Sequence, residues 1–269
     1  MPTGIGCAPV AQSGARAHPR KSRVPAATSG LASVDLPDAR MMSEGRSPSG
    51  GPATAGAGPV RIWDLPTRLF HWLLAALVLC SVVTAKLGGL WIDWHMRAGY
   101  AILALVLFRV LWGFAGSRYA RFANFVRGPR AVLDYLRGHG AQGAGHSPLG
   151  ALSVLALLAA LLVQAASGLF ANDAIATEGP LAKLVSGAFS DTLTSLHKRG
   201  EYLLYGLVGL HLAAIAFYRL VRHQDLLRPM LSGNRQASAE PARDDAAMRL
   251  RAALLAALSA ALVGYIVTL

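Results

Sequence analysis

Apolar residues fall into five long runs that are separated by polar segments, and this pattern dominates the chain after about residue 59. Each run approaches the twenty or so residues that an α-helix needs to cross the hydrocarbon core of a bilayer. Bilayer strands are shorter and alternate apolar with polar positions, so the runs predict helices. The expected helices cover about Leu69–Leu87, Ala98–Gly116, Leu149–Phe170, Tyr202–Val221 and Leu250–Leu269.

The composition is that of a polytopic membrane protein. Of the 269 residues, 54% are hydrophobic and only 15% are charged, which excludes an ordinary soluble domain. The net charge of +12 comes from arginines that cluster between the apolar runs, so it does not indicate nucleic-acid binding. The two cysteines, Cys7 and Cys80, form neither a disulfide framework nor a C-x-x-C-H haem-attachment motif. Any haem is therefore expected to be held by ligation and packing alone.

Three regions follow from the pattern. Residues 1–58 are rich in Pro, Gly, Ala, Ser and Arg and show no periodicity, which predicts a disordered tail. Met41 and Met42 lie where a shorter reading frame could begin. Residues 59–232 hold four of the apolar runs, and residues 233–269 hold a linker and the fifth. We therefore expect an all-α integral membrane protein, a four-helix transmembrane bundle with a fifth C-terminal transmembrane helix.

Basic residues are distributed unevenly between the segments that join the runs. Segment 117–148 carries five arginines against one acid, and segment 219–251 carries seven arginines, whereas the other two connections are less basic or are balanced by acids. Because basic loops stay in the cytoplasm, the N-terminus and both Arg-rich segments are predicted to be cytoplasmic and the C-terminus to lie outside. Five tryptophans near predicted helix ends are expected to form an interfacial belt: Trp63, Trp72, Trp91, Trp94 and Trp112.

Two histidines are predicted to project from nearly the same face of a membrane-spanning helix, with His197 just before the fourth apolar run and His211 inside it. His197 and His211 are fourteen residues apart. This spacing is about 40° short of four full turns and about 21 Å along a helix axis. An imidazole inside a membrane is costly and by default marks a functional site. Two imidazoles stacked near the two membrane edges indicate a pair of haems, one above the other.

Depth assigns a partner to each of these histidines. His71 lies about one turn into the first predicted helix, level with His211, and His95 stands just before the second helix, level with His197. A six-coordinate haem needs two imidazoles from different helices at one depth. The pairs His71–His211 and His95–His197 meet this requirement. A single such histidine is more often an interfacial residue without a special role, but the pairing of four by depth reverses that preference.

Four basic residues are placed to bind haem propionates. Arg109 lies near the cytoplasmic end of the second predicted helix, at the depth expected for a haem on His71. A buried guanidinium needs an anionic partner, and a propionate supplies one. Arg68, one turn before His71, is placed to serve the same haem, and Lys198 and Arg199 are placed to serve the outer one. For Arg68, Lys198 and Arg199, ordinary interfacial anchoring is an equally open interpretation.

Three segments resemble the bacterial cytochrome b561 and Ni-hydrogenase cytochrome b-subunit family of four-helix di-haem membrane proteins. They are Trp63–Trp72 (WDLPTRLFHW), His95–Tyr100 (HMRAGY) and His197–His211, and the resemblance spans about residues 60–232. The fourteen-residue histidine spacing is its most specific part. The resemblance implies two haem b groups, with both axial positions of each iron filled by histidine. The implied ligands are His71, His95, His197 and His211.

The resemblance also implies a function. It predicts a cytochrome of the bacterial inner membrane that transfers electrons between the membrane quinone pool and a partner redox protein. The partner is expected to be a periplasmic cytochrome or a hydrogenase-like subunit, and quinone is the expected substrate. The long N-terminal tail and the fifth helix depart from the simplest family members, which leaves the specific partner open.

A histidine-dependent metal-ion transporter or binding protein is the alternative from another class. It would need acidic or histidine pairs along a central pathway, yet Glu201, at an edge, is the single acid in any apolar run. A membrane di-iron oxygenase would need clusters such as H-x-x-H-H, which do not occur. The sequence also offers no nucleophile, acid–base dyad or nucleotide loop. An electron-transfer subunit is therefore favoured over a stand-alone catalyst.

Overall fold

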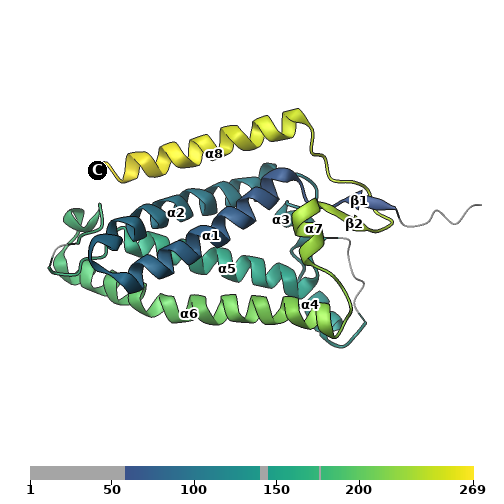
Figure 1. Cartoon of the computed structure of the whole chain (residues 1–269), viewed down its shortest axis with the longest axis horizontal. Coiled ribbons are helices and arrows are strands. Elements are labelled where there is room, and N and C mark those ends of the chain that lie inside the picture. The colour runs from purple at the N-terminus through teal and green to yellow at the C-terminus, as the bar shows by residue number, and fades with distance from the viewer. Residues whose placement is uncertain (1–57, 140–144, 176) are drawn as a thin grey trace, which may run out of the picture. The chain divides into compact units, whose positions relative to one another are not determined.

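Five long helices dominate the computed structural model, which describes residues 58–139, 145–175 and 177–269. They are α1 (Leu65–Leu87), α2 (Ile92–Ala115), α5 (Pro148–Gly168), α6 (Gly187–Leu220) and α8 (Ala246–Ile266) (Figure 1). Each is long and apolar enough to cross a membrane. The prediction of an all-α membrane protein with a fifth C-terminal helix is confirmed. The predicted tail lies, except for Gly58, outside the described residues.

Short elements join the long helices. Between α1 and α5 lie η1 (Gly89–Trp91), α3 (Phe122–Phe125) and α4 (Pro129–Leu136), and η2 (Ala182–Leu184) precedes α6. After α6 come α7 (Leu227–Ser232) and the strand β2 (Asn234–Gln236). β2 pairs antiparallel with β1 (Pro59–Arg61), with Val60 opposite Arg235. This two-stranded sheet brings the start of the described chain against the segment that leaves the four-helix region.

Two helices begin earlier than the apolar runs indicated. α6 begins at Gly187 and not near Tyr202, because Ser186 caps its N-terminus by accepting a hydrogen bond from the Phe189 amide, and the polar residues that follow continue the helix. α2 begins at Ile92, six residues before the expected Ala98. His95 and His197 were expected just before their helices and instead lie inside them. Both imidazoles are therefore held by a regular helical backbone.

Helix α2 is the centre of the bundle. It packs along α1 on one side, and along α5 and α8 on others, while α6 packs along α5. No comparable backbone packing joins α1 to α6 among the described residues. The two helices that carry His71 and His211 are thus bridged by side chains rather than by close helix packing.

The core around α2 includes one residue that was expected at the membrane interface. Trp112 is fully buried, its ring stacks on Phe108 with centroids 5.9 Å apart, and its Nε1 donates to Thr67 Oγ1 at 3.2 Å. The prediction that Trp112 belongs to an interfacial belt is wrong. Its indole N–H finds a hydrogen-bond acceptor inside the bundle, which allows a tryptophan to be buried.

The N-terminus of α1 is fixed by a buried carboxylate. Asp64 caps the helix by accepting from the Thr67 amide at 2.7 Å, and it also accepts from the Ser117 hydroxyl. Gly233, at the end of α7, adopts the left-handed conformation with φ +87°, which glycine tolerates without strain. Its carbonyl accepts from the amides of Ile62 and Trp63 at 2.8 and 3.1 Å. The beginning of α1 and the end of α7 therefore form one joined structure.

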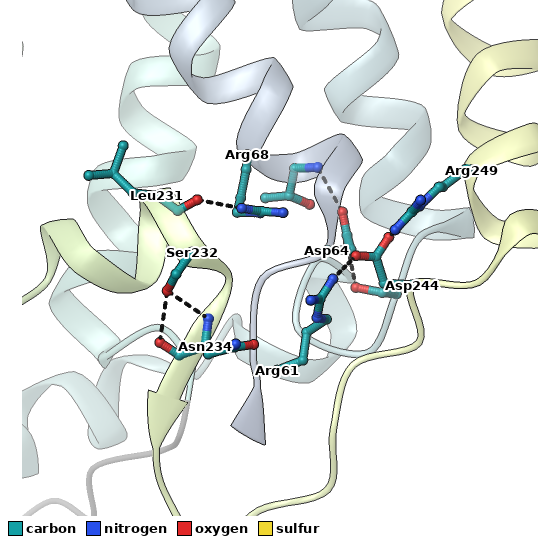
Figure 2. A network of polar contacts seen from close by, with 10 residues as sticks. Arg61, Asp64, Arg68, Leu231, Ser232, Asn234, Asp244 and Arg249 are labelled. Atoms are coloured by element: carbon teal, nitrogen blue, oxygen red, sulfur yellow. Dashed lines mark hydrogen bonds and ion pairs between the residues drawn. The ribbon is translucent and has the colours of Figure 1, made fainter. Parts of the chain in front are cut away.

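A second carboxylate attaches the segment before α8 to this joined structure (Figure 2). The Asp244 side chain is 3% exposed and pairs with Arg61 of β1 and with Arg249 of α8. The Ala242 amide donates to the Arg61 carbonyl at 2.7 Å. The region predicted as a linker is therefore bonded to the start of the bundle at several points.

Candidate functional site

The structure brings together the two histidine pairs that depth predicted. The ring centroids of His71 in α1 and His211 in α6 are 6.4 Å apart, and those of His95 in α2 and His197 in α6 are 6.0 Å apart. Two imidazoles that bind one metal through nitrogens about 2 Å away place their centroids roughly 6 Å apart. Each pair is therefore spaced as two ligands on opposite sides of a single metal ion.

Each pair offers two ligands and no third. Within the described ranges, no three His, Cys, Asp or Glu side chains gather as a metal cluster. A structural zinc site needs four protein ligands and a catalytic one usually three, whereas a haem iron needs only its two axial ligands from the protein. The donor set of each pair thus fits a haem better than a bare metal ion.

The His95–His197 pair is oriented by neighbouring helices. His95 Nδ1 lies 2.9 Å from the Ser81 carbonyl oxygen and 3.1 Å from its hydroxyl oxygen, both in α1. His197 Nδ1 lies 2.8 Å from the Gln164 carbonyl oxygen in α5. A ring nitrogen that donates to a carbonyl fixes the tautomer and leaves the other nitrogen free to bind a metal. Both imidazoles are therefore prepared to ligate through Nε2.

Glycines let α5 and α6 approach closely enough for this orientation. A Cβ atom on Gly168 would lie 2.9 Å from Cε1 of the His197 ring, and one on Gly200 would collide with the Gln164 side-chain oxygen. Gln164 in turn donates its amide to the His197 carbonyl at 2.9 Å. The contacts that Ser81, Gln164 and both glycines make with the histidines were not predicted, because they depend on which helices lie side by side.

The His71–His211 pair has fewer hydrogen bonds to the surrounding protein than the His95–His197 pair. His71 Nδ1 is buried and has no hydrogen-bond partner, and its ring lies edge-on to Trp72 with centroids 5.0 Å apart. A buried polar nitrogen without a partner costs stability. At this position it is consistent with a bound group that completes the site.

The predicted propionate-binding residues lie at both ends of the bundle. The Arg109 side chain is buried, its Nη1 has no partner, and its guanidinium lies 5.2 Å from the centre of the Phe122 ring. Arg68 donates from Nη1 to the Leu231 carbonyl, while its buried Nε has no partner. Lys198 and Arg199 are exposed beside His197. Binding of propionates by all four stays a prediction, which the unpartnered nitrogens of Arg109 and Arg68 support.

His146, which was given no part in the predicted pairs, lies near Arg109 just before α5. Its ring packs against Trp63 and Phe125 with centroids 4.7 and 4.4 Å away. Burial, and to a smaller extent the charge of Arg109, lowers the pKa of His146 to about 3. The imidazole is therefore neutral at physiological pH, and its buried Nδ1 has no partner. A neutral ring avoids adding a second buried positive charge beside Arg109.

A helical membrane bundle that presents paired histidines between its helices has the architecture of a membrane cytochrome b. The sequence comparisons agree. The model of the prokaryotic cytochrome b561 family matches residues 62–233, and the chain belongs to this family. The match ends at the glycine after α7, so β2 and α8 lie outside it.

The chain is also similar to a probable Ni/Fe-hydrogenase B-type cytochrome subunit from Bradyrhizobium diazoefficiens. The two are 22% identical over 222 residues, which cover 69% of this chain and 90% of the relative. No solved structure matches the chain significantly. The protein is thus a multi-pass bacterial membrane protein, a b-type cytochrome that takes part in electron transfer and carries haem b.

Proposed function

We propose that the protein binds two haem b groups and moves electrons across the membrane between the quinone pool and a partner redox protein. The observation that carries this proposal is the geometry of the two pairs. Both have the centroid spacing of two imidazoles on one metal, and their α6 members are fourteen residues apart on one continuous helix. That separation is about 21 Å along the helix axis, so the pairs lie at different depths of the bundle.

The residues of the chain supply position and electrostatics. When bound, the haem irons would supply the one-electron chemistry. His71 and His211 would hold one haem, and His95 and His197 the other, with the second pair held in a fixed tautomer by Ser81 and Gln164. Arg68 and Arg109 would bind the propionates of the first haem, and Lys198 and Arg199 those of the second.

The distribution of arginines supports an orientation in the membrane, and the similarity to the Bradyrhizobium protein supports a class of redox partner. The Arg-rich segments would lie in the cytoplasm, which places the His71–His211 pair on the cytoplasmic side and the His95–His197 pair on the outer side. The outer haem would exchange electrons with a periplasmic cytochrome or a hydrogenase-like subunit. The hydrogenase-related name of the Bradyrhizobium relative supports the second choice. Residues 59–232 would form the cytochrome domain, and residues 233–269 would add the fifth helix.

The test is haem content and redox behaviour of the purified protein. We expect two haems per chain, and we expect His71→Ala and His95→Ala to remove different spectral components, because each imidazole is one of only two axial ligands. His139→Ala, which changes an exposed histidine outside both pairs, is the matched control. One haem per chain, or loss of the same component in both variants, would overturn the assignment of the pairs. Haems that a quinol analogue neither reduces nor reoxidises would overturn the quinone assignment alone.

A further inference from the structure

An ion pair connects α1 to α6, two long helices that, among the described residues, do not pack as closely along each other as α1 and α2 do. Lys86, at the end of α1, pairs with Glu201 in α6, and their side chains are 60% and 28% exposed. The Lys86 ammonium also lies 6.0 Å from the centre of the Tyr205 ring. The pair therefore bridges α1 and α6 near the same end of α1 as Ser81, which contacts His95.

Glu201 has a defined position relative to the His95–His197 pair. It follows His197 by four residues in one helix, so its side chain leaves nearly the same face, about 6 Å further along the axis. Glu201 stands where the polar first part of α6 meets its apolar run, and at the edge of a membrane a carboxylate is favoured when a basic side chain pairs with it, as Lys86 does. Here the charge lies one turn from a predicted axial ligand.

We propose that the Lys86–Glu201 pair sets the reduction potential of the haem held by His95 and His197. This proposal rests on the proposed function, because it requires a haem at that pair. When the iron gains one electron, the total charge at the haem falls by one unit. A nearby carboxylate therefore stabilises the oxidised form and lowers the potential, and a nearby ammonium opposes it. Glu201 thus acts on the iron through space and is not a ligand.

The expected size follows from Coulomb's law. One unit charge about 10 Å away, at an effective dielectric constant of about 20, changes the reduction equilibrium constant roughly tenfold. Lys86 is the more exposed partner, so water and salt screen its charge more strongly and its effect is smaller. The effects of the two charges on the reduction potential therefore do not cancel, and the net shift has the sign of the Glu201 contribution.

Three variants test the proposal by spectroelectrochemical titration, which resolves the potential of each haem component. We expect Glu201→Gln to favour the reduced form of the His95–His197 haem roughly tenfold, a rise of about 59 mV for a one-electron couple. Lys86→Met should lower the same potential by a smaller amount. The combined exchange Lys86→Glu with Glu201→Lys keeps an ion pair between the helices but places a positive charge beside His197, so it should raise the potential above that of the wild type.

The exchange variant separates electrostatics from a merely structural bridge. A structural bridge predicts that the exchange restores the original potential, and that result would overturn the proposal, as would a lower potential in Glu201→Gln. Asp191→Asn removes an exposed acid from another face of α6 and serves as the control, with little shift expected. If Glu201→Gln loses the haem, the exchange variant alone decides the sign. A wild-type protein without a haem at this pair would instead defeat the proposed function, which stoichiometry shows before any titration.

Discussion

Removing the charge of Asp244 should loosen the attachment of α8. The carboxylate is almost completely buried and pairs with Arg61 of β1 and with Arg249 of α8, the latter at 3.1 Å (Figure 2). Asp244→Asn keeps the size of the side chain but removes both charge-assisted contacts. A hydrogen bond to a charged group is worth about 1.5–3 kcal/mol. Because Arg61 is half-buried and Arg249 is exposed, solvent screens both contacts. Asp244→Asn should therefore lower the free energy of unfolding by about 1–3 kcal/mol for the two contacts together.

The matched control is another ion pair on the same connecting segment. Arg118 and Glu240 also form an ion pair, but both side chains are mostly exposed. An exposed pair contributes about 0–1 kcal/mol, so Glu240→Gln should leave stability nearly unchanged. Thermal unfolding in detergent measures both variants. Equal destabilisation by Asp244→Asn and Glu240→Gln would refute the argument that burial makes the first pair strong.

The effect of Asp244 should also depend on pH in one direction. Burial alone would raise the pKa of this carboxyl, but the bonds from Arg249 and Arg61 outweigh burial and hold the pKa below its usual value of 3.8. A carboxyl group whose pKa is lower in the folded than in the unfolded state stabilises the fold at pH values above its unfolded-state pKa. This contribution is lost as the pH falls through the folded-state pKa. The stability difference between wild type and Asp244→Asn should therefore be constant near neutral pH and shrink below about pH 4. A difference that grows in acid would contradict this sign.

Two further predictions concern the outer pair and the topology. Gly168→Ala should lower haem occupancy at the His95–His197 pair, because the added Cβ would lie 2.9 Å from the His197 ring and displace it, whereas Gly264→Ala, in open space on α8, should not. Absorbance spectra of the two purified variants compare them, and equal occupancy would show that the ring adapts without cost. A reporter fused after Leu269 should be active only outside the cytoplasm, because the Arg-rich segments are expected inside and α8 crosses once more. Activity restricted to the cytoplasm would reverse the assigned orientation.

The membrane spans could be predicted from the sequence because the bilayer imposes a single length and composition on every helix that crosses it. The start of α6 could not be predicted in this way. Residues between Gly187 and Glu201 are too polar to count as a span, yet a helix needs only hydrogen bonds and acceptable propensities, which Ser186 and the residues after it provide. The apolar run therefore marked the membrane segment of α6 and not the whole helix.

The histidine pairs could be predicted because helical periodicity and membrane depth fix where each imidazole lies. The orientation of the rings could not. The Ser81 and Gln164 carbonyls that fix His95 and His197 belong to other helices, and no spacing along the chain records those contacts. The burial of Trp112 was missed for the same reason, since its hydrogen-bond acceptor is Thr67 of α1.

The two ends of the bundle differ in how completely the protein satisfies its own polar groups. In the part of the chain that the structure describes, the buried side-chain nitrogens without a hydrogen-bond partner lie at the end where α1 begins: Arg68 Nε, His71 Nδ1, Arg109 Nη1 and His146 Nδ1. At the opposite end, both histidines of the outer pair have backbone carbonyls as partners for Nδ1. An unsatisfied buried polar group costs about 1–3 kcal/mol, so the first end gains most from a bound anionic group such as a haem with its propionates. The protein itself orients both imidazoles of the outer pair, so the role proposed for Glu201 is to adjust the potential of a haem bound there and not to hold the imidazoles in place.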